Sequence, residues 1–272
     1  MTMHPALARL RVTARIVALT FRASLDYRGE FLVNVLFGAV YQTSVIVFAS
    51  VVLGRFPGMG GWPAHAVLMI VALRMLSHAL FWLFFGRIAT LAEFVQEGNL
   101  DALLLRPLPV YRQVQLATFP SNAFGDLIVG VSLFVAAVLS FDVPWTPARI
   151  LYTAAALAGG TLLEAAVYTT LSCLHFRFPA AVQWSYWTAE LMSTFGNYPL
   201  KVLPRAVGWA FTFVLPLAFI AYLPTGVLTG NTAGLGVPAA VAAASPAVGV
   251  VAYLVSRLLW NRALRGYTGI NG

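Results

Sequence analysis

Long apolar runs separated by polar connections dominate this chain of 272 residues. A helix that crosses a bilayer needs about 20 mainly apolar residues, and six stretches meet this requirement. We therefore predict an all-α integral membrane protein with six spans, at about 31–53, 64–85, 119–140, 148–172, 206–228 and 236–258. Pro216 and Pro224 interrupt the fifth stretch, so that span is expected to be kinked, broken or partly re-entrant. Together the spans form one transmembrane domain over residues 31–272.

The segment before the first span, residues 1–30, has the pattern of an amphipathic helix. Its apolar residues recur at steps of three and four, while the arginines mostly fall elsewhere on the helical wheel; these apolar residues are Leu7, Leu10, Ala14, Val17, Phe21 and Leu25. Such a helix is expected at about 5–28 in the inner headgroup layer, in contact with membrane lipids, although a short solvated helix has the same pattern. Because the long apolar run starts only at Phe31, we expect no cleavable signal peptide.

Composition supports the membrane assignment and narrows the partners. The chain is 60% apolar and 10% charged, whereas a soluble domain has about 25% charged residues. The net charge of +8 comes mainly from arginines between apolar runs, which suits anionic lipid headgroups rather than nucleic acid. With the N-terminus in the cytoplasm, inner segments hold fourteen cations and outer segments two, with Lys201 and Arg205 in the inner connection 173–205. This bias predicts a cell-membrane protein with both termini cytoplasmic.

The inner connection 86–118 predicts a compact pair of helices on the cytoplasmic side. The first helix has an apolar face made of Ile88, Leu91, Ala92 and Val95. Gly98 can end this helix, Asn99 can cap a short second helix, and Pro107 can stop it. The leucines of the second helix form an apolar ridge made of Leu100, Leu103 and Leu104. Exposed leucines beside Glu97, Asp101 and Arg106 suit docking to another protein, and packing on the chain's own bundle is the alternative.

Two segments resemble the type-2 ABC permease family, the membrane subunits of many bacterial ABC exporters. Residues 97–108, EGNLDALLLRPL, are similar to the cytoplasmic signature of that family, with Gly, then Leu-Asp, a leucine cluster, a basic residue and proline. Residues 216–224 are similar to its "P-x-A-F … Y-x-P" pattern, and Tyr198-Pro199 and Leu203-Pro204-Arg205 precede them. With the six expected spans and the leading amphipathic helix, the resemblance covers the whole chain.

This resemblance implies a permease subunit that forms half of a translocation pathway. Family members pair as homodimers or with a second permease, and a separate ATPase subunit, which binds ATP and Mg²⁺, docks beneath them. The implied ATPase-coupling residues are Glu97, Gly98, Leu100, Asp101, Leu103, Leu104, Arg106 and Pro107. The single lysine, Lys201, is followed by Val202 rather than by Ser or Thr, so no phosphate-binding loop is present. We therefore expect no cofactor on this chain.

Three charged side chains fall within the predicted spans: Arg74, Asp126 and Glu164. A charge at the bilayer centre costs at least about 2.5–3.5 kcal/mol, so each should face the bundle, a wet cavity or a partner. Arg74 and Glu164 lie on a substrate route or form a structural ion pair, and the ion pair is the simpler interpretation. An ion-coupled secondary transporter, the alternative function, would use these three residues without an ATPase.

An intramembrane enzyme is a further alternative, but the catalytic patterns are weak. The sequence has no His-Glu-x-x-His motif, and His78 and His175 are explained more simply by helix packing than as bases. Four scattered histidines and the single Cys173 show no metal-ligand spacing, and one cysteine forms no intrachain disulfide. The sequence therefore predicts no catalytic residue and no metal site.

Overall fold

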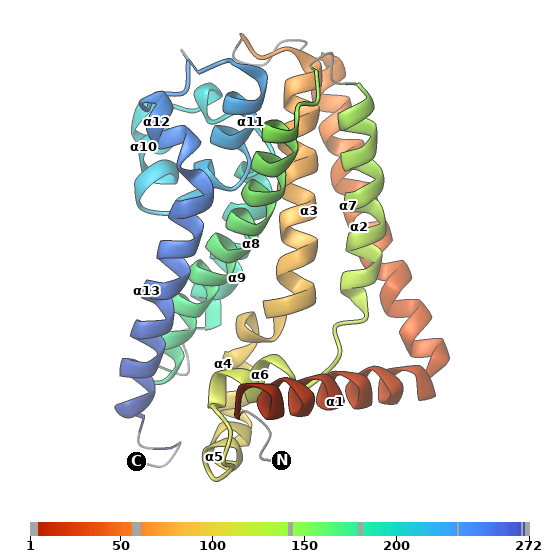
Figure 1. Cartoon of the computed structure of the whole chain (residues 1–272), viewed down its shortest axis with the longest axis vertical. Coiled ribbons are helices and arrows are strands. Elements are labelled where there is room, and N and C mark those ends of the chain that lie inside the picture. Colours follow the sequence, from red (N-terminus) through yellow and green to blue (C-terminus); the bar gives the residue numbers. More distant parts are fainter. Residues whose placement is uncertain are drawn as a thin grey trace.

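A computed structural model describes residues 5–55, 61–140, 144–178, 182–232, 234–267 and 269, and all regular structure in these ranges is helical. Long helices form a bundle, and α1, Pro5–Asp26, lies crosswise to them at one end (Figure 1). We call this end of the bundle the α1 end and the other the opposite end. The C-terminal part of the chain also reaches the α1 end.

An aromatic cluster holds α1 against the start of the bundle. The Phe21 ring of α1 lies 6.4 Å from the Phe31 ring of α2, Arg28–Arg55, and 4.8 Å from the Phe119 ring. Phe31 and Phe119 both contact Phe124 of α7. The expected helix before the first span is therefore present, and its apolar residue Phe21 faces the bundle.

Four helices in the described ranges are long and apolar enough to cross a membrane. They are α2, α3 (Ala64–Ala89), α7 (Asn122–Leu139) and α8 (Pro147–His175), which agree with the first four predicted spans to within a few residues. Helix α3 lies between α7 and α8, and its residues from Val67 to Leu73 are mostly fully buried. The main apolar core therefore forms around α3.

Glycines allow two helix pairs to approach closely. A Cβ added to Gly249 of α13, Ser245–Arg265, would overlap the carbonyl oxygen of Gly159 in α8. Similarly, a Cβ on Gly125 of α7 would overlap the Val35 carbonyl oxygen of α2. Small residues at such contacts are the usual way in which membrane helices pack, because backbone contact replaces the hydrophobic driving force that lipid removes.

The predicted fifth span is broken, as its prolines indicated, and its place in the fold differs from the prediction. Residues 206–228 form only short helices: α10 (Arg205–Phe213), η4 (Leu217–Phe219) and α11 (Tyr222–Thr229). These lie toward the opposite end, together with α12, Ala239–Ala243 (Figure 1). The helix breaks at Pro216, which has ψ of 49° and cannot donate a helical hydrogen bond.

The connection 173–205 contains a helix that the sequence analysis missed. Helix α9, Val182–Phe195, packs on α8, and His175 at the end of α8 bonds to the Ser185 hydroxyl of α9 (3.0 Å). Helix α9 rises from the α1 end, and the turn at Gly196 and the 3-10 helix η3, Leu200–Val202, continue the chain toward the opposite end. Residues 173–205, predicted as an inner connection, therefore include a helix that packs on the bundle.

Lys201 and Arg205 were predicted in the inner connection 173–205, on the same side as residues 86–118, but they lie away from that end. Lys201 Nζ would lie 3.2 Å from a Cβ on Gly234, whose carbonyl oxygen accepts a bond from the Tyr222 hydroxyl (3.4 Å). The Tyr222 ring packs at 5.2 Å on Trp62, which precedes α3 at the opposite end. Because α9 and residues 196–202 carry the chain toward the opposite end, where α10 begins at Arg205, both cations lie in the half away from α1. The last predicted span, 236–258, corresponds to α12 and α13, which extends to Arg265.

Candidate functional site

The connection at the α1 end folds as the predicted helical turn. Helix α4, Leu91–Gln96, continues α3 after Thr90, and α5, Asn99–Leu104, follows Gly98. Gly98 has φ of 74°, the left-handed conformation that favours glycine where a helix stops. Asn99 does not cap α5 as predicted, because Gly98 occupies the N-cap position and Asn99 is the first residue of the helix. The side-chain amide of Asn99 donates to Glu97 Oε2 (2.7 Å). Pro109 then precedes α6, Val110–Gln115, a helix that the sequence analysis did not predict.

The ridge of leucines on α5 is divided between core and surface. Leu100 and Leu103 are buried, so they do not lie on the exposed ridge that the sequence predicted. They belong to a second apolar cluster, which we call the base core, made of Ile88, Leu91, Val95, Leu100, Leu103, Val110, Tyr111, Val114, Phe176 and Trp260. A helix of six residues has too little surface for its sequence to show which face a neighbour will cover. Burial here comes from α4, α6 and the ends of α8 and α13.

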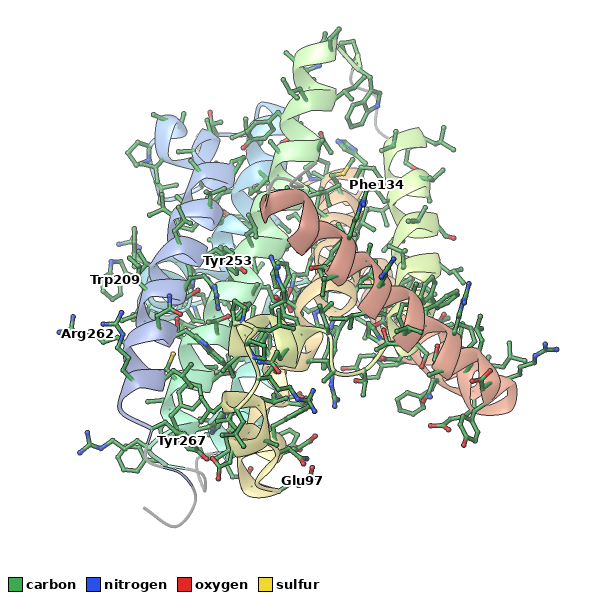
Figure 2. All side chains as sticks on the ribbon, turned by 60° about the horizontal axis from the view of Figure 1, so that its bottom comes forward. Glu97, Phe134, Trp209, Tyr253, Arg262 and Tyr267 are labelled. Atoms are coloured by element: carbon green, nitrogen blue, oxygen red, sulfur yellow. The ribbon has the colours of Figure 1, made fainter. Side chains whose placement is uncertain are left out.

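The exposed tip of α4 and α5 combines leucines with acidic groups. Leu104 is 43% exposed and Leu105, which the sequence analysis did not single out, is 89% exposed. Glu97 and Asp101 are also exposed, and Figure 2 shows Glu97 projecting from the turn between the two helices. Tyr267 lies beside the same segment, and burial together with the Asp101 carboxylate raises the pKa of its phenol to about 12. We refer to Glu97, Asp101, Leu104 and Leu105 as the α5 tip.

Helix α6 joins the base core to α8 and α13 through Tyr111. Its hydroxyl bonds to the Thr169 hydroxyl of α8 (3.1 Å), and the Arg257 guanidinium of α13 lies 3.4 Å from the centre of its ring. The Trp260 ring of α13 meets Tyr111 edge-on at 5.0 Å. A cation over an aromatic face contributes about 0.5–2 kcal/mol, more when desolvated. No sequence signal pairs Tyr111 with Arg257, since 146 positions separate them.

A buried ionic network occupies the middle of the bundle. Arg74 Nη1 of α3 lies 3.0 Å from Glu164 Oε2 of α8, and the other carboxylate oxygen accepts from His78 Nδ1 (2.5 Å). Both charged side chains are at most 4% exposed. The two charges thus form the structural ion pair that the sequence favoured, which offsets the cost of placing either alone in the membrane.

Hydrogen-bond partners also assign the proton positions on His78. Trp82 Nε1, which can only donate, lies 3.0 Å from His78 Nε2. His78 Nε2 must therefore accept, which leaves the proton on Nδ1 to be donated to Glu164. The imidazole is then neutral, and Glu164 balances the single charge of Arg74. Helix packing rather than base catalysis accounts for His78, and His175 is similarly bonded to Ser185.

Arg74 extends the network from α3 and α8 to α9. Its Nη2 lies 3.5 Å from the Met192 carbonyl oxygen, in the last turn of α9, where helix carbonyls carry partial negative charge. Gly196 allows this approach, since a Cβ there would lie 2.7 Å from Arg74 Nε. One guanidinium therefore connects three helices.

Asp126 lies outside this ion pair, although it is buried. Its carboxylate on α7 faces Gln42 of α2. Gly38 of α2, which packs closely against α7, lies beside the same carboxylate. No described cation forms an ion pair with Asp126. Asp126 therefore belongs to the α2–α7 contact.

A small polar cleft opens between α2, α3 and α9 next to the network. Its volume is about 30 Å³, and it is lined by Tyr41, Gln42, Val45, Arg74, Met75, His78, Ser193 and Asn197. A cavity of this size holds a water molecule. Among the described residues, no three His, Cys, Asp or Glu side chains gather as metal ligands would.

A family model described as ABC-2 family transporter protein matches residues 39–271. The chain belongs to the ABC-2 transporter family. The matched range begins within α2 and includes both the α5 tip and the Arg74–Glu164 pair. No curated protein and no solved structure matches this ABC-2 family chain.

Membership in the ABC-2 family makes the protein a membrane component of a transporter rather than an enzyme. It agrees with the four long apolar helices and with the type-2 ABC permease resemblance of the α5 segment. The candidate functional residues of this ABC-2 protein lie in two places: the α5 tip at the α1 end, and the ionic network within the bundle.

Proposed function

We propose that this ABC-2 family chain is the permease subunit of an ATP-driven exporter in the cell membrane, working with a separate ATPase that binds ATP and Mg²⁺. The observation that carries the proposal is the α5 tip, where exposed leucines and acidic groups project from a turn that is anchored to three membrane helices. Exposed apolar side chains that lie beside charged groups suit a protein-binding site.

The α1 end faces the cytoplasm in this proposal. Six crossings are formed by α2, α3, α7, α8, α9 with residues 196–202, and α13. Moving Lys201 and Arg205 to the opposite end leaves twelve cations at the α1 end and four at the other. The bias still favours cytoplasmic termini. Helix α1 then lies in the inner headgroup layer, as expected for an amphipathic interfacial helix.

Cysteine labelling tests this orientation, because the chain has one native cysteine to remove. In a Cys173→Ser background, Lys201→Cys is expected to react with a membrane-impermeant maleimide in sealed right-side-out vesicles. Arg262→Cys is expected to react only after the vesicles are permeabilised. Both side chains are exposed in the described structure, so burial does not account for a difference. Labelling of both positions from the same side would contradict the six crossings.

Movement of the ATPase would reach the bundle through the base core. Leu100 and Leu103 join the α5 tip to Ile88 of α3, Phe176 after α8 and Trp260 of α13. From Ile88, α3 continues for about four turns to Arg74, which contacts α8 and α9. Closely packed interiors transmit displacement rather than absorb it. The tip is therefore proposed to displace α3, α8 and α9 together.

Binding of the ATPase is the experiment that tests the proposal. The double variant Leu104→Glu/Leu105→Glu is expected to weaken the affinity for an ABC ATPase that co-purifies with the wild-type chain by at least about ten-fold. Asp101→Arg is expected to act in the same direction, because it reverses the charge of the tip. Affinity can be measured by biolayer interferometry with the purified permease in detergent.

The matched control is Asn261→Glu, which adds an acidic group to an exposed position of α13 at the same end. It is expected to bind the ATPase as wild type does, and all variants are expected to unfold at the wild-type temperature. Equal affinity of the tip variants would show that the α5 tip is not the coupling surface. Transport driven by a proton gradient without any ATPase would instead support the ion-coupled alternative.

The polar cleft supports the proposal that this chain forms only half of a pathway. Arg74 and His78 line the cleft, but it opens between α2 and α9, whose neighbouring faces carry exposed apolar side chains such as Phe37 and Trp187. A second permease, either another copy or a related chain, would close that side. Glu164 then positions Arg74 and His78 at the pathway, and Asp126 supports the α2–α7 wall.

A further inference from the structure

A groove separates α1 from α5 and α6 at the α1 end. Its volume is about 460 Å³, within the range of small-molecule sites, and it does not include the leucines of the α5 tip. The lining comes from one face of α1 and from the segment that follows Leu103: Val12, Thr13, Ile16, Thr20, Leu103, Arg106, Leu108, Arg112, Gln113, Leu116 and Ala117. The groove is therefore mostly apolar, with a few polar groups on one wall.

Two arginines make the polar wall positive. Arg106 and Arg112 both line the groove, and no described carboxylate forms an ion pair with either guanidinium. The lining contains no acidic residue. Two unpaired guanidinium groups beside apolar side chains match a ligand that has an anionic group at one end and hydrocarbon at the other.

Gln113 adds an unsatisfied acceptor to the same wall. Its Nε2 donates to the carbonyl oxygens of Leu103 (2.9 Å) and Leu108 (2.7 Å), so these bonds determine which end of the amide is nitrogen. The side chain is only 9% exposed, and Oε1 has no partner among the described residues. A buried acceptor without a partner is costly, and a ligand hydroxyl would satisfy it once the lining shifts enough to uncover Oε1, which has almost no exposed surface.

We propose that the groove binds phosphatidylglycerol from the leaflet at the α1 end. The phosphate pairs with Arg106 and Arg112, and a glycerol hydroxyl of the headgroup donates to Gln113 Oε1. The backbone glycerol and first acyl carbons lie on Val12 and Ile16 of α1. Because α1 lies crosswise to the spans, the groove is at the depth of the headgroups if the bundle crosses the membrane as described (Figure 1). The lipid would then join α1 to the base core without an ATPase.

Native mass spectrometry tests the proposal with the full-length protein in detergent and no ATPase present. The probe is an equimolar mixture of phosphatidylglycerol and phosphatidylcholine with the same acyl chains. Wild type is expected to retain phosphatidylglycerol over phosphatidylcholine by about ten-fold or more. Arg106→Gln/Arg112→Gln is expected to lose that preference. The matched control, Arg22→Gln/Arg262→Gln, removes the same charge from exposed positions outside the groove and is expected to keep it.

A second probe isolates Gln113. Phosphatidylmethanol has the same charge as phosphatidylglycerol but no headgroup hydroxyl, so wild type is expected to retain it several-fold less. In Gln113→Leu the two lipids are expected to be retained equally. Equal loss in both arginine pairs, no preference over phosphatidylcholine, or displacement of the lipid by inorganic phosphate alone would each overturn the proposal. None of these outcomes bears on ATPase binding, which is measured separately.

Discussion

Glu164→Gln is expected to lower the free energy of unfolding by about 3–5 kcal/mol, which is a fall of about 10 °C in Tm. The glutamine leaves the Arg74 charge without a counter-charge in the middle of the bundle, where Glu164 has no exposed surface. Glu164 accepts from Arg74 and from His78 through separate oxygens, whereas glutamine has only one acceptor oxygen and therefore satisfies only one of the two donors. Thermal unfolding of the purified protein in a mild detergent measures the effect.

The double variant Arg74→Met/Glu164→Leu separates loss of the pair from loss of one partner. Removing both charges leaves no unpaired ion, so Tm is expected to recover most of the way to wild type. Glu190→Gln, which neutralises an exposed carboxylate of α9, is the control and should change Tm little. If both single variants, Arg74→Met and Glu164→Gln, unfolded at the wild-type temperature, the buried ion pair would be contradicted.

Gly249→Val is expected to destabilise the bundle by about 3 kcal/mol. A Cβ at this position overlaps the Gly159 carbonyl oxygen, which is backbone and has no flexible side chain to move aside. Helices α8 and α13 must therefore separate, and the contacts along their shared length weaken together. The expected result in detergent is a lower Tm and a smaller monodisperse fraction on gel filtration.

A graded series and a matched position sharpen this test. Gly249→Ala is expected to have a smaller effect than the valine variant, and Gly159→Ala a similar one, because a Cβ there would lie 2.5 Å from Pro246 Cα. Gly29→Val in α2 has nothing within 4 Å and is expected to be nearly neutral. Equal Tm values for Gly249→Val and Gly29→Val would show that α8 and α13 are further apart than described.

The losses of stability expected for Glu164→Gln and Gly249→Val both concern contacts that connect the α5 tip to the bundle. Helices α8 and α13 contribute Phe176 and Trp260 to the base core, and the ionic network holds α3 and α9 against α8. A permease that uses these connections should lose coupling when they loosen, even with the tip intact. Stability and ATPase affinity are therefore best measured on the same variants.

The sequence by itself determined where the long helices lie. Apolar runs of about 20 residues predict α2, α3, α7 and α8, because the length of a spanning helix depends on the bilayer and not on its neighbours. Local chemistry also determined the turn at Gly98 and the stop before Pro107, since a left-handed residue and a missing amide act within a few positions. The family followed from the same segment.

Only the tertiary structure decided the path of the chain after α8. Helix α9 has Gln183 and Glu190 among its aromatic residues, so its hydropathy falls below that of residues 206–228, which contain Pro216 and Pro224. The apolar pattern therefore indicated a span at 206–228 and gave no signal for α9. What holds α9 in the bundle is its contact with α8 and the bond from Arg74 to its last turn. Neither contact is visible in a local pattern.

Only the tertiary structure also decided which partners the individual side chains contact. The arginine of the Arg74–Glu164 pair is 90 positions from its carboxylate, and the sequence could only show that each charge needed a partner. Leu100 and Leu105 look alike in sequence, yet one is fully buried and the other 89% exposed, because burial on so short a helix depends on α4, α6, α8 and α13. Periodicity determines where helices form, whereas long-range contacts determine which of their faces remain for a partner.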